Sequence, residues 1–477
     1  MAMGNDGGKE QGELYIPHTE LRGAGHPFYE ALDRVLRNVG FDRFVEDQCS
    51  PHYAEVMGRP SLPPGVYFRC LLIGYFEGID SERGIAWRVA DSLSLRSFLG
   101  FGMQAPPHHS TLSRTRRRLP VEVHDRVFTW VLGRLAENKL LVGKTVGVDA
   151  TTLEANAAMR SIVRRDDGRK YNEYLEDLAK AAGIEEPTRD DLKKVDKKRK
   201  KKGSNKDWVH PLEPEAQIMK MKDGRTHLAH KHEQAVDFAS GAVVAVTLHG
   251  GAAGDTKTVG ETLAQAETNL QEVRSECSAE AQELLAERIE EFVADKGYHS
   301  NDVLCDLEEV DIRSYIPEPA RGRRRWKGKN AERDAVYRNR RRTRRAKSKK
   351  LQRKRGELLE RPFAHLLETG GMRRVHLRGQ RNILKRLLIH VAGFNLGLLM
   401  RKLVGVGKPR ALQGAYGLFS SAFFVLVATP HALWAPCVLL AWRWPTNDAF
   451  RMWSRSANER LPLLAVGWPA GTKTTGC

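Results

Sequence analysis

Apolar side chains in the first part of the chain recur at helical spacing, every three or four residues. The clearest set is Phe28, Leu32, Val35, Leu36 and Val39. Ser81 stands just before another helical stretch and can cap it, because its hydroxyl can accept from a free backbone N–H of the first turn. The pattern predicts an all-helical N-terminal domain at residues 27–140, after a flexible, glycine-rich and charged leader at 1–26.

From residue 144 the pattern changes to short β-branched or apolar runs separated by turn residues. These runs predict strands at 145–149, 216–222, 226–238, 242–248, 292–295 and 312–316. Asp223–Gly224 and Ser240–Gly241 are typical turn pairs, so the second, third and fourth strands should form an antiparallel meander. Helical patterns return in several places, at 255–266, 279–289, 357–368 and 384–403. The highly charged stretch 160–210 is interpreted as a partly disordered helical insertion.

The order strand, meander, helix, strand, helix is typical of a ribonuclease-H-like α/β core, which we place at residues 144–405. In such a core one acid lies within the first strand, a second ends a neighbouring strand, and a third comes from a helix packed on the sheet. Here these acids are Asp149, Asp295 and Glu360. Glu357 is kept in reserve as the third acid, because residues three apart share a helix face.

Carboxylates in this arrangement point to divalent metal. Two Mg²⁺ or Mn²⁺ ions about 4 Å apart need shared oxygen ligands, and hard cations prefer carboxylates. One ion would activate an attacking water or hydroxyl, and the other would stabilise the leaving oxygen. The sequence therefore predicts a two-metal site made by Asp149, Asp295 and Glu360.

The charge balance favours a polyanionic partner, because 78 Lys and Arg outnumber 59 Asp and Glu and the excess is clustered. The clusters are at 114–118, 197–202 and 321–355. Residues 321–350 hold sixteen Lys or Arg and few apolar side chains, so we expect a solvated linker or a DNA-contacting arm there. The side chains assigned to double-stranded DNA are Arg114, Arg116, Arg117, Arg118, Lys296, Arg353 and Arg361. No small-molecule substrate is expected.

Other features bound the cellular setting. The six cysteines are scattered without metal-ligand spacing, as in a reducing compartment, so a cytoplasmic protein is expected. Residues 406–477 are interpreted as an irregular apolar tail. Its stretch 418–442 is long enough to cross a bilayer, but Pro430 and Pro436 interrupt it, and a membrane span is not favoured.

A histidine group at 227, 230 and 232 lacks a completing Cys or acid, so phosphate contact or plain surface is favoured over metal binding.

Several stretches together resemble bacterial insertion-sequence transposases of the IS5 and IS1182 type, in the wider DDE transposase group. They span about residues 50 to 410 and are Gly58–Arg59–Pro60 through Arg83–Gly84–Ile85, His109–Arg114, Val148–Thr151, Ala294–Tyr298, Glu360–His365, Leu377–Gly379 and His390–Gly397. The resemblance implies that Asp149, Asp295 and Glu360 are the three acids in order. It also implies an enzyme that binds the terminal inverted repeats of its element, cuts at the ends and joins them to target DNA.

One part of the family pattern is not matched. The family often has Tyr, Arg and Lys at fixed offsets from the third acid, where this chain has Arg353, Gly356 and Leu367 relative to Glu360. Counting from Glu357 recovers only Arg353, at the arginine offset.

From the three acids, the basic clusters and the resemblance together, we expect a DDE transposase that works as a homodimer or higher assembly on nucleoid DNA. The alternatives are a nuclease of the same fold without strand transfer and an inactive, transposase-derived DNA-binding protein.

Overall fold

The computed structural model describes residues 25–412, apart from 55–57, 59, 103, 199–203, 222–223, 321 and 323. The chain forms two compact units, which meet after Leu398. Most of the expected leader and the apolar stretch 418–442 lie outside the described residues, as do Arg59, Asp223 and part of the basic run 197–202.

The N-terminal part consists of helices, as the apolar spacing predicts. They are α1 (Pro27–Asn38), α2 (Phe41–Cys49), α3 (Pro64–Glu77), α4 (Glu82–Ala90), α5 (Leu93–Phe98), α6 (His109–Arg118) and α7 (Val121–Glu137). Ser81 caps α4 by accepting from the Gly84 N–H at 3.2 Å, which confirms the predicted cap. Helix α3 is buried around most of its circumference, and even its Arg69 is buried, with ion pairs of 2.7 Å to Asp33 and to Asp42. The boundary at residue 140 remains a prediction.

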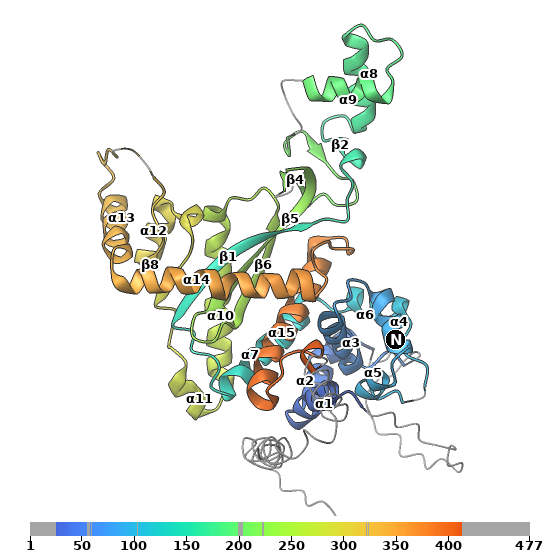
Figure 1. Ribbon diagram of the computed structural model, residues 1–477, viewed down its shortest axis with the longest axis vertical. Helices are drawn as coiled ribbons and strands as arrows, with labels where there is room; N and C mark the ends of the chain where they lie inside the picture. The colour runs from blue at the N-terminus through green and yellow to red at the C-terminus, as the bar shows by residue number, and fades with distance from the viewer. Residues whose placement is uncertain are drawn as a thin grey trace, which may run out of the picture. The chain divides into compact units, whose positions relative to one another are not determined.

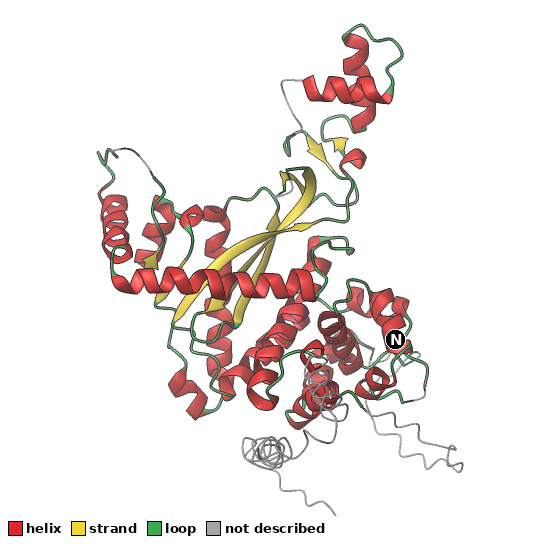
Figure 2. Ribbon diagram, viewed as in Figure 1, coloured by secondary structure: helices red, strands yellow, loops and turns green. Residues whose placement is uncertain are grey.

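The second part is built on a mixed sheet, so the protein is an α/β protein (Figure 2). Its strands are β1 (Thr145–Glu154), β4 (Gln217–Lys220), β5 (Thr226–Asp237), β6 (Val243–Gly250), β7 (Glu291–Val293) and β8 (Arg313–Tyr315). The strand order is β4-β5-β1-β7-β8. Strand β6 pairs with the edge of β5 that also carries β4, at a position further along β5. Strand β5 is antiparallel to β1, β4 and β6, whereas β1, β7 and β8 are mutually parallel. The two antiparallel pairings predicted for β5 are confirmed, but β4 and β6 both lie on the edge of β5 opposite β1, so the three strands do not form the side-by-side meander that was expected.

Helices cover both faces of this sheet. Alternate side chains of β5 point to opposite faces, so the contacts of neighbouring β5 residues show which helix lies on each face. Thr258 and Thr262 of α10 (Asp255–Glu276) bond to Glu233, whereas His232 packs against Phe363 of α14 (Ala346–Ala364). Helix α14 crosses the strands (Figure 1). Shorter helices complete the layers: α11 (Ala279–Leu284), α12 (Asn301–Glu309) and α13 (Asn330–Thr343). The helix expected at 279–289 ends at Leu284, because the chain then turns into β7.

The charged insertion is folded around its own aromatic core. It contains β2 (Val163–Arg164), α8 (Tyr171–Ala181), α9 (Arg189–Lys198) and β3 (Trp208–Val209). Trp208 is buried, and the rings of Tyr171 and Tyr174 pack edge-on against it at 5.2 and 5.3 Å. The expected helices are therefore present, and the described residues of the insertion are ordered around these rings although the segment is highly charged.

The expectation of a solvated linker at 321–350 is wrong for the described residues. Most of the stretch is α13 and the beginning of α14, and Ala335 and Val336 are buried. The arginines are accommodated because distant acids pair with them. Arg342 pairs with Glu308 of α12 at 2.8 Å, and Arg340 pairs with Glu318 at 2.8 Å.

Two asparagines close the edges of the sheet. Asn395 of α15 (Gln380–Val404) accepts from the Val243 N–H at 3.0 Å and donates to the Val243 carbonyl at 2.8 Å. Asn339 of α13 makes the same pair of bonds with Ile316, just beyond β8, at 3.2 and 2.8 Å. By length and composition α15 could cross a membrane, but 89% of its apolar window is buried, as in a core helix.

Candidate active site

Asp149 lies within β1, and Asp295 follows the end of the neighbouring parallel strand β7 by two residues. Gly147 of β1 pairs with Val293, the last residue of β7, so two residues further along each chain Asp149 and Asp295 stand side by side. Asp149 is opposite Gln234 of β5, which donates to the Leu359 carbonyl of α14. Because paired residues share a face, Asp149 points to the α14 side of the sheet.

The surroundings of Asp149 disfavour its charge. Burial raises the pKa of this carboxyl, and the negative charges of Asp295 and Asp255 raise it further. The Ala150 N–H, which donates to it at 2.8 Å, and the Arg355 guanidinium, 3.5 Å from its Oδ2, act in the opposite direction. The net direction is upward. Additional positive charge at this position would therefore be favourable.

Asp295 is held by the turn that it begins. Its side chain accepts from the Gly297 N–H at 2.7 Å and caps a short 3₁₀ turn, η3 (Lys296–Tyr298). A Cβ on Gly297 would lie 2.9 Å from Asp295 Oδ1 and also 2.9 Å from Asp255 Oδ2, so the two oxygens are separated by no more than twice that distance. Glycine leaves this space open, and Asp255, at the start of α10, is an acid that the sequence reasoning missed.

The third predicted acid lies on the helix that crosses β1. A Cβ on Gly147 would lie 3.3 Å from the Leu359 side chain of α14. The Leu359 face of α14 therefore packs on β1, the strand that bears Asp149. Glu360 follows it, is exposed, and makes no ion pair with any described residue. Glu357 lies about 200° round the helix from Leu359 and pairs with Arg361 at 2.8 Å. Glu360, about 100° away, is nearer to the sheet, which favours it over Glu357.

The donor chemistry suits a divalent cation, but only two of the predicted ligands are brought together. Asp149 and Asp295 offer carboxylate oxygens from adjacent strands. Among the residues that the structure describes, no three acid, histidine or cysteine side chains are close enough to enclose an ion. The pair therefore fits a cation that would also take ligands from DNA, water or a repositioned Glu360.

The predicted DNA-binding side chains fall into two groups. Arg114, Arg117, Lys296 and Arg353 are exposed. Arg361 is exposed but pairs with Glu357, and Arg118 is half-buried over the ring of Tyr53 at 4.8 Å. Arg116 is a correction: it is buried and forms an ion pair of 2.6 Å with Glu82, so it is not part of the exposed surface of α6.

The histidines on β5 are also a correction. His230 and His232 share a face, as expected for residues two apart, but both are fully buried and neither is on the surface. Burial lowers the pKa of His232 to about 3, so this imidazole is neutral. Helices on both faces of the sheet explain the burial. The intervening and following side chains, Lys231 and Glu233, are buried on the opposite face, and sequence reasoning missed them as well.

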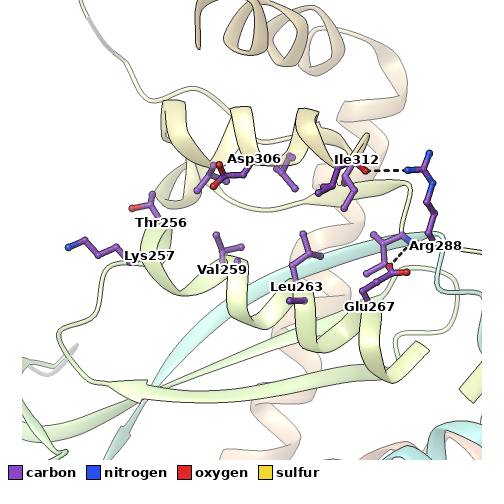
Figure 3. Close-up of a pocket in the computed structure, with 14 residues that line it drawn as sticks. Thr256, Lys257, Val259, Leu263, Glu267, Arg288, Asp306 and Ile312 are labelled. Carbon is purple, nitrogen blue, oxygen red and sulfur yellow. Dashed lines mark hydrogen bonds between the residues drawn. The ribbon is translucent and has the colours of Figure 1, made fainter. Parts of the chain in front are cut away.

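A groove of about 510 Å³ lies between α10 and α12 (Figure 3). Apolar side chains line its length, among them Val259, Leu263 and Leu307. Arg288 closes one end by donating to the Val310 carbonyl at 3.2 Å. None of the three predicted acids is among its lining residues, so it is separate from the acidic site.

The fold and the site together define an α/β protein with an acidic site on adjacent parallel strands. Residues 19–118 match the family model described as Transposase domain (DUF772). The match supports a transposase, an enzyme that acts on nucleic acid. It covers much of the helical N-terminal part and ends before β1. No curated protein and no solved structure matches the chain.

Proposed function

We propose that this chain is a DDE transposase of the IS5 or IS1182 type with a ribonuclease-H-like core. The strand order supports the core: an antiparallel β1-β5-β6 unit is followed by β7 and β8, which are parallel to β1. The observation that carries the proposal is the placement of Asp149 in β1 and of Asp295 just beyond the end of β7, the strand that pairs with β1. The transposase-domain match supports the same class independently, since it lies in another part of the chain.

In this proposal Asp149 and Asp295 hold Mg²⁺ or Mn²⁺ together with Glu360. The bound cations would supply Lewis-acid stabilisation of the attacking and leaving oxygens in an in-line phosphoryl transfer. The chain's own residues set the conditions for this reaction. The Ala150 and Gly297 N–H groups orient the two carboxylates, and Arg355 offsets the negative charge of Asp149 before the cation binds.

The DNA would be held by cations that have no acid partner among the residues that the structure describes. Arg114 and Arg117 of α6, with Lys296 beside Asp295 and Arg353 on α14, are exposed and available for phosphate. Because each phosphate contact releases counterions, affinity should fall steeply with salt. A flat salt response would contradict this part of the proposal.

The deciding experiment uses end-labelled duplexes taken from the DNA on each side of the coding sequence. With the full chain and Mg²⁺ or Mn²⁺ we expect strand cleavage at the element ends and joining of the new 3′ ends to a plasmid. Cleavage without joined product would indicate a nuclease of the same fold. Binding without cleavage in either metal would indicate an inactive DNA-binding protein and would overturn the proposal.

A further inference from the structure

Two buried ionisable side chains of β5 have no part in the chemistry proposed so far. Lys231 is 5% exposed and Glu233 is fully buried, on the α10 face of the sheet. Burying a charge costs several kcal/mol unless it is paired and hydrogen-bonded. A hydrophobic pair would fill the same space without that cost. The pair therefore calls for an explanation beyond packing.

Lys231 uses its ammonium group to join three elements. Its Nζ lies 2.7 Å from Asp255 Oδ1, 2.8 Å from Thr258 Oγ1 and 3.2 Å from Glu233 Oε1. Asp255 and Thr258 belong to the first turn of α10, so the lysine holds the beginning of that helix against β5. The lysine thus binds Oδ1 of Asp255, whereas Oδ2 of the same carboxylate adjoins the open space at Gly297.

Glu233 extends the connection to the turn that follows Asp295. Its Oε1 accepts from the Tyr298 hydroxyl at 2.9 Å, and its Oε2 accepts from the Thr262 hydroxyl at 2.5 Å. Burial and the negative charge of Glu233 raise the pKa of Tyr298, so the phenol stays protonated and donates. Since Tyr298 ends the 3₁₀ turn that Asp295 caps, Glu233 holds that turn in place.

We propose that Lys231 and Glu233 are positioning residues of the Asp149–Asp295 site: they hold the turn that Asp295 begins and keep Asp255 beside Asp295. This inference rests on the proposed function and deepens it. Asp255 lies close enough for its charge to act on Asp149, and its Oδ2 adjoins the same open space at Gly297 as Asp295. A fully hydrogen-bonded buried network is rigid, as an arrangement of like charges requires in order to persist.

The test removes the network without leaving a buried charge unpaired. The double variant Lys231→Met/Glu233→Gln is neutral, and loss of both partners together should cost little stability. Tyr298→Phe deletes only the hydroxyl and serves if the double variant does not fold. Lys257→Met changes an exposed lysine in the same first turn of α10, two residues after Asp255, and is the matched control. Two quantities are measured: the rise in Tm of the DNA-free protein with Mg²⁺ concentration, and cleavage of the labelled duplexes.

For a positioning role we expect the Mg²⁺ concentration at half-maximal Tm shift to rise at least about tenfold in both network variants. Cleavage kcat should fall by a similar factor while KM for DNA is unchanged, and Lys257→Met should behave as wild type. A merely structural network predicts a lower Tm with an unchanged Mg²⁺ dependence, and that result would overturn the inference. If wild type shows the Tm shift but never cleaves DNA, the proposed function fails, whereas the Tm comparison still decides the positioning role.

Discussion

Replacing Asp149 with asparagine should make the metal-free protein more stable while removing its activity. The carboxyl is 24% exposed, and burial raises its pKa above the usual aspartate value, with a further contribution from the nearby charges of Asp295 and Asp255. A raised pKa means that folding disfavours the ionised form. The cost is absent below the pKa of the unfolded chain, grows as the pH rises through the interval to the folded pKa, and is complete above it.

Each tenfold change in this ionisation constant corresponds to about 1.4 kcal/mol of unfolding free energy. In a domain of 150–250 residues 1 kcal/mol shifts Tm by roughly 2–4 °C, so a gain of a few degrees at most is expected here. The gain for Asp149→Asn should be present at pH 7.5 and should vanish near pH 3, where the wild-type carboxyl is protonated. Scanning calorimetry with EDTA at several pH values measures this difference.

Mg²⁺ should reverse the ranking. A cation at a hundred times its Kd stabilises the folded wild type by about 2.7 kcal/mol, whereas the amide variant loses a charged ligand and most of that gain. Cleavage should be absent in the variant, and duplex affinity in EDTA should be unchanged. An Asp149→Asn protein that is less stable than wild type in EDTA at pH 7.5, or that cleaves DNA, would refute the reasoning.

Five further substitutions test the site, the basic surface and the sheet edge. Glu360→Gln should abolish cleavage, whereas Glu357→Gln should leave it within about twofold in a gel assay, because Glu357 faces away from the sheet. Arg116→Ala should lower the unfolding free energy in urea by about 3 kcal/mol through loss of a buried ion pair, whereas Arg117→Ala should leave stability unchanged and reduce the salt slope of DNA binding by about one. Asn395→Leu should cost about 1–3 kcal/mol for each of the two backbone groups that it leaves unpaired, as measured by urea unfolding.

The sequence was sufficient to predict β1, which bears Asp149, and β7, which ends two residues before Asp295 rather than at it, because each acid ends or interrupts a short β-branched or apolar run. The antiparallel pairing of β5 with β4 and with β6 was predictable from the turn pairs and is confirmed, whereas the placement of both partners on one edge of β5 was not predicted. Which strands pair with β1 was a matter of topology rather than local pattern, and the register that sets the two acids side by side came only with the structure.

Residues that depend on distant partners could not be assigned. Lys231 and Glu233 look like solvated charges of a half-exposed strand, and only Asp255, Thr258 and Tyr298, far along the chain, make their burial possible. The arginines of α13 misled in the same way, because Glu308 and Glu318 supply the charges that allow a helix there. One signal could have pointed to a buried network: charged residues alternate along a strand that is predicted to lie in a sheet covered by helices on both faces.

Asn339 and Asn395 give the sheet a property that its strand order alone would lack. An open sheet has two outer strands whose free backbone groups can recruit strands from other molecules. Here a helix side chain occupies one N–H and one C=O at each border, at Ile316 and at Val243. Growth of the sheet by addition of a foreign strand would first have to displace these amides. A protein that gathers in several copies on one DNA could thus do so without its sheets fusing.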